Sequence, residues 1–120
     1  MKAAVLTNYD KNGRKLEIQE VEKPSPREKE VLVKVFTAAV NPLDNMIIRG
    51  EVKLIVPYSL PLIMGNEFAG QVEAVGSAVK RFKAGDRVYG RMPLSKIGAF
   101  AEYAAVEEGA LAPIPDYLSY

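Results

Sequence analysis

Residues 31–44, VLVKVFTAAVNPLD, predict a long strand that passes directly into a short helix. Residues 31–40 are rich in β-branched and other apolar side chains and form the longest uninterrupted strand-like stretch of the chain. Apolar residues fall on both faces of this strand, since Leu32 and Phe36 alternate with valines. A strand that is apolar on both faces is typical of the interior of a sheet, so we expect it to be a central strand.

The pattern changes from strand to helix at Asn41. Asparagine is a favoured N-cap, and Pro42 suits the first helical position. Asp44 falls in the first turn, where the helix dipole favours negative charge. Apolar side chains then recur at helical spacing up to Gly50, which provides a C-terminal stop. We predict a helix over residues 42–49.

The flanking sequence predicts further short strands separated by turns. Two strand-like segments flank a turn-forming run that ends at Gly13, which is the signature of a hairpin. Residues 51–64 have neither strand nor helix periodicity and are expected to form an ordered surface loop. The additional strands are expected at residues 2–9, 16–21, 68–75, 98–106 and 111–114. Residues 82–90 are expected to form a turn that leads into another short strand. About seven short strands with one helix favour a barrel or sandwich, so the expected fold class is mainly β.

Length and charge restrict the classes of partner. A chain of 120 residues is the size of one domain with one core. Sixteen basic and fifteen acidic residues leave a formal net charge of +1, so neither nucleic acid nor a membrane surface is an expected partner. No apolar stretch approaches the roughly 20 residues of a membrane span, and the N-terminus does not resemble a signal peptide. We therefore expect a cytoplasmic protein.

The chain contains no cysteine and no histidine. Disulfides are impossible, and nucleophilic systems that need a thiol or an imidazole are excluded. Zinc sites in proteins almost always include at least one of these two residue types. We therefore expect no metal site in this chain.

Four segments resemble the GroES-like catalytic domain of medium-chain dehydrogenase/reductases, and more narrowly the zinc-independent quinone oxidoreductase group. Their order and spacing carry the resemblance, which extends over nearly the whole chain. The segments are AVNPLD at 39–44 followed by IRG at 48–50; PLIMGNEFAG at 61–70; VG at 75–76 followed by FKAGDRVYG at 82–90; and GAFAEY at 98–103. The resemblance implies a partly open GroES-like β-barrel over residues 1–120, with a short helix after the third strand.

The resemblance also implies a function for a longer parent protein. Zinc-bearing alcohol dehydrogenases carry a cysteine and a histidine ligand at the places held here by Asn41 and Asn66, and neutral amides are poor substitutes for those ligands. The family otherwise pairs this domain with a Rossmann domain that binds the dinucleotide, and the Gly-rich fingerprint of that domain is absent from residues 1–120. The implied parent is a homodimeric NADPH-dependent oxidoreductase that reduces a quinone, an enone or a related carbonyl.

Two residues are candidates for contact with the cofactor. The family match places Asn41 at the cleft, although an N-cap role alone also explains this residue. Asp44 is a candidate for orienting the site, while its place in the first helical turn provides a purely structural explanation.

Three residues are candidates for catalysis. Asn66 and Glu67 lie at the start of a strand where the zinc enzymes place a ligand. The Glu67 carboxylate either passes a proton at the cleft or stays ionised in a pair with an arginine such as Arg49. Tyr58, in the proline-flanked loop, is a candidate donor to a substrate carbonyl oxygen.

A different class of function stays open at this point. The chain could be a free-standing GroES-like module for binding or assembly, whose 51–64 loop engages a protein partner. Under the enzyme hypothesis the 120 residues alone are expected to be inactive, because the dinucleotide would be bound mostly by the Rossmann domain.

Overall fold

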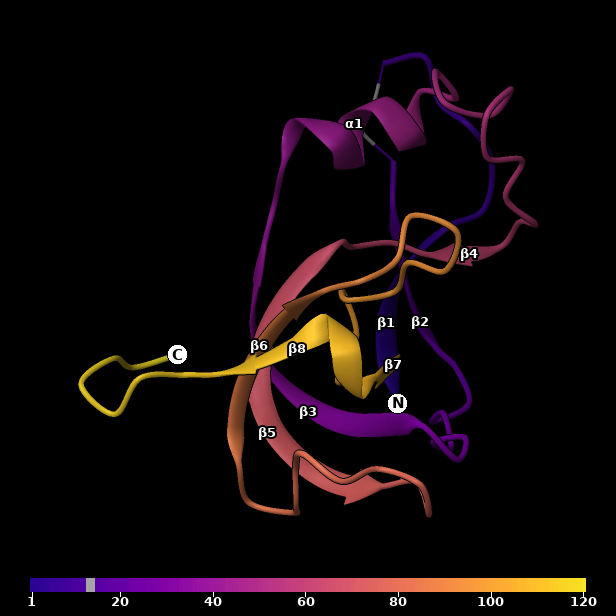
Figure 1. Cartoon of the computed structure of the whole chain (residues 1–120). Coiled ribbons are helices and arrows are strands. Elements are labelled where there is room, and N and C mark those ends of the chain that lie inside the picture. Colours follow the sequence, from indigo (N-terminus) through magenta and orange to yellow (C-terminus); the bar gives the residue numbers. More distant parts are fainter. Residues whose placement is uncertain (13–14) are drawn as a thin grey trace.

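The computed structural model describes residues 1–12 and 15–120 and shows a mainly β chain with one α-helix (Figure 1). The helix, α1, spans Pro42–Ile48, and a 3₁₀ turn, η1, spans Glu108–Ala110. The strands are β1 Lys2–Leu6, β2 Glu17–Glu20, β3 Glu30–Ala39, β4 Leu62–Ile63, β5 Glu67–Val75, β6 Arg87–Arg91, β7 Tyr103–Glu107 and β8 Leu111–Pro113.

The strands form two antiparallel sheets. One sheet has three strands in the order β2-β1-β4, and the other has five in the order β7-β3-β5-β6-β8. An isolated bridge between Ala3 and Ala101 also links β1 to the segment before β7. Over the described residues these orders leave both sheets open at their edges, so the mainly β, partly open GroES-like architecture is confirmed.

The central position predicted for residues 31–40 is confirmed, since β3 pairs with β5 on one side and β7 on the other. The predicted hairpin is present as the β1–β2 pair. The Gly13 end of its predicted turn lies outside the described residues.

Several predicted boundaries were wrong. β1 ends at Leu6 rather than at residue 9. Residues 62–63 lie inside the predicted 51–64 loop but form β4, because their backbone pairs with β1. Two residues are too few to show a strand period. The strand predicted over 98–106 begins only at Tyr103, because the preceding residues form a loop packed against Gly65.

The helix prediction was long by one residue. Arg49 is the C-cap rather than a helical residue, and Gly50 follows with a φ of 79°, a conformation that favours glycine. The Gly50 N–H donates to the Ile47 carbonyl at 3.0 Å, which closes the helix end.

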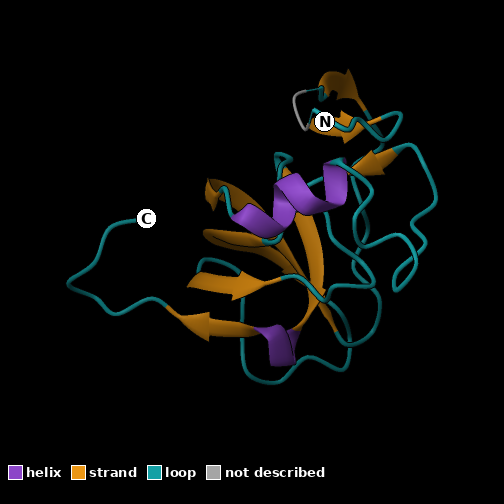
Figure 2. Cartoon of the chain, turned by 90° about the horizontal axis from the view of Figure 1, so that it is seen from above, coloured by secondary structure: helices purple, strands orange, loops and turns teal. Residues whose placement is uncertain are grey.

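The core lies between the sheets and beneath α1, which spans one end of the five-stranded sheet (Figures 1 and 2). Val31 and Val33, in the first half of β3, are fully buried. The second half of this strand leaves the core: Phe36 is 49% exposed, and Val40, just after it, is 74% exposed. β3 is therefore buried in its first half and exposed towards its C-terminal end, just before α1 begins.

A buried carboxylate anchors the start of β3. Glu30 accepts a hydrogen bond from the Arg27 N–H at 3.0 Å and forms an ion pair with Lys96 at 2.9 Å. Burial alone would raise the pKa of Glu30, but these two partners outweigh it and hold the pKa below its ordinary value of 4.5. The pair ties the 92–98 loop to β3.

We expect Lys96→Met to lower the free energy of unfolding by about 1 kcal/mol at neutral pH, because the ammonium group is partly exposed. The stabilisation from a carboxylate with a lowered pKa is present above pH 4.5 and is lost as pH falls through the lower folded-state pKa. The unfolding temperatures of the wild type and Lys96→Met should therefore converge as the pH is lowered below 4.5. Lys29→Met, at an exposed position, is the control, and a difference independent of pH would contradict this account.

Candidate functional site

The ends of two neighbouring strands bring the predicted site residues together. β3 and β5 are antiparallel, with Ala39 opposite Glu67. The end of β3 therefore lies beside the start of β5, and Asn41 and Asn66 follow and precede this register pair. α1 begins at the same edge of the sheet (Figure 1).

Asp44 is the hub of a buried polar network at this edge. Asp44 is the third residue of α1 and is only 1% exposed. Oδ2 accepts a hydrogen bond from the backbone N–H of Asn41 at 2.7 Å, and Oδ1 accepts one from Nδ2 of Asn66 at 2.7 Å. The carboxylate therefore links the end of β3, the start of α1 and the segment that leads into β5.

Asn66 is held from behind by the backbone around it. Its carbonyl accepts a hydrogen bond from the Met92 N–H at 2.7 Å, and the preceding carbonyl, of Gly65, accepts from Gly98 and Ala99 at 3.0 Å each. Gly65 has a φ of 107°, and a Cβ built there would lie 2.4 Å from the Phe100 nitrogen. Only glycine fits before Asn66 without displacing this loop.

One atom of the network has no partner among the described residues. Asn66 is 2% exposed, and its Oδ1 is buried without a hydrogen-bond donor. A buried carbonyl oxygen without a donor is unfavourable. The described residues provide no donor for this one.

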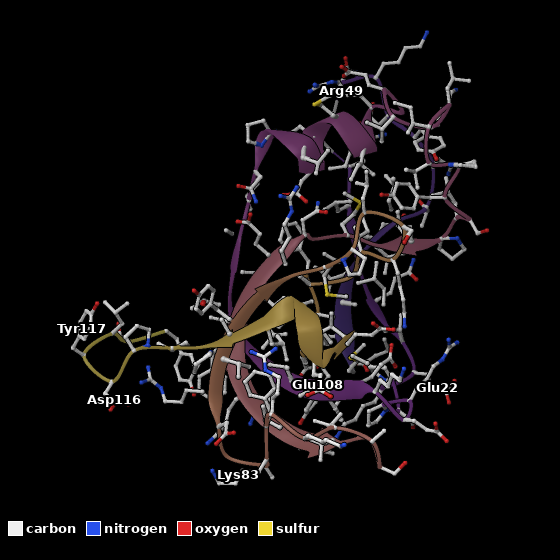
Figure 3. The ribbon with its side chains drawn as sticks, in the orientation of Figure 1. Glu22, Arg49, Lys83, Glu108, Asp116 and Tyr117 are labelled. Carbon is white, nitrogen blue, oxygen red and sulfur yellow. The ribbon has the colours of Figure 1, made fainter. Side chains whose placement is uncertain are left out.

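Glu67 faces a different environment from Asn66. It is half-buried and lines a groove of about 780 Å³ over the exposed ends of β3, β5, β6 and β8. Arg91 on β6 lies directly opposite in the register. Arg49, considered from the sequence as a partner for Glu67, instead pairs with Glu51 beyond the outer end of α1 (Figure 3).

The groove combines apolar walls with a few polar groups. No sequence motif points to Arg91 or Thr37. The register places Arg91 opposite Glu67 and Thr37 opposite Ala69, and both residues line the groove. The residues that define its floor and rim include Thr37, Ala39, Glu67, Tyr89, Arg91 and Leu111.

Tyr58 lies apart from the Asp44 network. Its hydroxyl donates to the carbonyl of Leu94, which ties the 51–61 segment to the 92–98 loop. Burial, with a smaller contribution from Tyr9, raises the pKa of the Tyr58 phenol, so it stays protonated at neutral pH. The structure therefore joins Asn41, Asp44 and Asn66 by hydrogen bonds, while the predicted role of Tyr58 at a substrate carbonyl stays a prediction.

The described residues offer neither a cluster of metal ligands nor a membrane-spanning helix. In the described part of the chain, no three or more acidic side chains gather where they could hold a metal ion. No helix within residues 1–12 and 15–120 has the length and apolar character needed to cross a membrane.

Comparison with known proteins agrees with the fold. Residues 27–116 match the family model of the alcohol dehydrogenase GroES-like domain. The chain is 36% identical over 119 residues to a chloroplastic quinone-oxidoreductase homolog from Spinacia oleracea, covering 99% of this chain and 36% of that protein. It is 39% identical over 99 residues to the quinone oxidoreductase of Sus scrofa, covering 81% of this chain and 28% of that protein.

Solved structures show the same relationship. The Escherichia coli quinone oxidoreductase complexed with NADPH superposes with a TM-score of 0.86 at 29% identity, covering 99% of this chain and 35% of that chain. The chain thus spans about a third of the length of the relatives it matches. The resemblance of the four sequence segments is confirmed, since relatives of the chain include quinone oxidoreductases. The chain belongs to the alcohol dehydrogenase GroES-like domain family.

Proposed function

We propose that the full-length protein transfers hydride from NADPH to a quinone, an enone or a related carbonyl, and that this domain forms one wall of its active site. The relatives include a quinone oxidoreductase and an NADPH-dependent alkenal/one oxidoreductase, of which this chain matches one part. The observation that carries the proposal is the Asp44 network, which holds two amides at the adjoining ends of β3 and β5. A Rossmann domain outside the 120 residues would bind most of the dinucleotide, so the domain alone would be inactive.

The donor chemistry supports a reaction without zinc. The sequence resemblance implies that Asn41 and Asn66 stand where zinc-bearing alcohol dehydrogenases have thiolate and imidazole ligands, and the chain has no cysteine or histidine to replace them. The Nδ2 of Asn66 is already bonded to Asp44. These residues do not fit a tight zinc site, and polarisation of a substrate carbonyl would come from hydrogen bonds.

The two candidate cofactor residues differ in burial, which supports a different role for each. Asn41 is half-buried at the exposed end of β3, so its side-chain amide can both donate and accept at the cleft. Asp44 is buried, and both of its oxygens accept from protein donors. NADPH would supply the hydride when bound; Asn41 would contact it, and Asp44 would act from behind by fixing the turn at Asn41.

Reduction of a carbonyl also needs a proton, and Glu67 is the carboxylic acid that lines the groove. Its half-buried carboxyl group can hold and release a proton at Oε beside the apolar walls formed by Ala39 and Leu111. Arg91, opposite Glu67 in the register, would place a positive charge beside the same groove.

The remaining assignments concern the whole protein. We propose a homodimer that acts on a small lipophilic carbonyl compound in the cytoplasm, without nucleic acid or membrane partners. The near-neutral net charge of +1 in this domain supports the exclusion of polyanionic partners. Curated relatives include chloroplastic and mitochondrial proteins, so fractionation of the native cell is the direct measurement of compartment.

We expect Asn41→Ala in the full-length protein to reduce kcat/KM for NADPH oxidation by roughly 10- to 100-fold, because a positioned hydrogen-bonding group at the cleft would be lost. Asn45→Ala changes an exposed asparagine of the same helix and is the matched control. Activity should survive prolonged treatment with a zinc chelator. Loss of activity on chelation, restored by zinc, would refute the zinc-independent reaction.

A further inference from the structure

The Asp44 carboxylate is buried beside neutral donors. The salt bridges of the described residues include no cation paired with Asp44, and the donors to its two oxygens are the Asn41 N–H and the Asn66 amide. A buried carboxylate needs donors on its oxygens more than a neutral group does. Asn66 is therefore the side chain on which the orientation of Asp44 depends.

The geometry of Asn66 suits a fixed support. Its backbone carbonyl is bonded to Met92, and the adjoining Gly65 carbonyl accepts two further N–H groups at 3.0 Å. Asn66 is 2% exposed and is not among the residues that line the groove, so its amide is not placed to contact a substrate there. The donor and not the acceptor of this amide is in use, since Oδ1 has no partner in the described part of the chain.

The Asp44 carboxylate, which Asn66 holds, in turn binds the backbone of Asn41. Asp44 Oδ2 holds the Asn41 N–H at 2.7 Å, and the Asp44 N–H in turn donates to the Asn41 carbonyl at 3.0 Å. Both backbone groups of Asn41 are thus fixed by one residue. The direction in which the Asn41 side chain leaves the end of β3 follows from these two bonds.

We propose that Asn66 is a positioning residue, which fixes the cleft residue Asn41 through the carboxylate of Asp44. The catalytic role predicted for Asn66 from its place in the sequence is thereby replaced by an indirect one. The consequence for activity rests on the proposed function, in which Asn41 contacts the cofactor. The consequence for the Asn41 backbone does not, and it can be measured separately.

The first experiment measures hydrogen exchange in the full-length protein at residue resolution. In Asn66→Ala, the Asn41 N–H should exchange at least about 10-fold faster than in the wild type, while the Val33 N–H in the buried half of β3 should change little. Asn45→Ala should leave both rates unchanged. An unchanged exchange rate at Asn41 in Asn66→Ala would overturn the proposal. An equal acceleration at Val33 would also overturn it, because Asn66 would then stabilise the whole fold rather than Asn41.

The second experiment exchanges the two side chains. In Asp44→Asn combined with Asn66→Asp, the new amide at position 44 can donate to the new carboxylate at position 66 and accept from the Asn41 N–H. Each single variant should lower kcat/KM for NADPH oxidation about 10-fold, mainly in kcat, and the double variant should recover to within about threefold of wild type.

The outcomes separate the possible roles. Recovery of both the Asn41 exchange rate and kcat supports positioning. Recovery of the exchange rate without kcat would show that the negative charge at position 44 is needed, and would overturn positioning as the role of Asn66 in catalysis. A wild-type protein that does not oxidise NADPH with any quinone or enone would refute the proposed function, while the exchange result would still decide whether Asn66 fixes Asn41.

Discussion

Gly70→Ala is expected to lower the free energy of unfolding by about 3 kcal/mol or more, because it forces a side chain into backbone that has no room for one. Gly70 lies in β5 opposite Val35, beside an irregularity in the β3–β5 register. A Cβ built at Gly70 would lie 2.0 Å from the Lys34 carbonyl oxygen and 2.9 Å from a methyl group of Val33. Relief of the closer contact requires β3 and β5 to separate at the centre of the five-stranded sheet.

Urea unfolding of Gly70→Ala beside the wild type measures this effect. Gly109→Ala is the matched control, since a Cβ at Gly109 meets no atom within 4 Å. The control should lie within about 0.5 kcal/mol of the wild type. Equal stability of the two variants would mean that β3 and β5 do not approach as closely as the structure shows.

Asp44→Ala is expected to combine a loss of stability with a loss of activity. The substitution leaves the buried Asn66 amide and the partly buried Asn41 N–H without their acceptor. Each unpaired buried group costs about 1–3 kcal/mol, so the expected loss is about 3 kcal/mol in total. We expect kcat/KM for NADPH oxidation by the full-length protein to fall at least about 10-fold, since the turn at Asn41 is then unsupported.

Two comparisons make this prediction specific. Asp44→Asn keeps one acceptor oxygen, so it should lose less stability than Asp44→Ala, and Asn45→Ala should lose little. The measurements are urea unfolding and steady-state kinetics on the same preparations. Unchanged stability in Asp44→Ala would contradict the bonding role assigned to this carboxylate.

Local patterns predicted those elements that their own side chains specify. The alternation of apolar residues identified β3, and the run from Asn41 through Asp44 placed the start of α1 correctly. The two-residue β4 was not predictable in this way, because its only strand-like feature is a backbone pairing with β1, some sixty residues away in the chain.

The candidate site shows the same division. Asn41, Asp44 and Asn66 were chosen from sequence, but the bond between Asp44 and Asn66 joins residues 22 positions apart. The opposition of Glu67 and Arg91 and the bond from Tyr58 to Leu94 likewise depend on how segments pack. No spacing rule within one segment contains these contacts.

Residue types and local patterns were sufficient to predict the mainly β class, the change from strand to helix at Asn41 and the absence of cysteine and histidine ligands for zinc. These properties depend on residue type and on short-range periodicity, which each segment carries regardless of its neighbours. The burial of Asp44 between two asparagines and the position of Glu67 at a groove arise from the packing of the folded chain. Both follow from the antiparallel register of β3 and β5, which is set by the packing of the two strands against a common core.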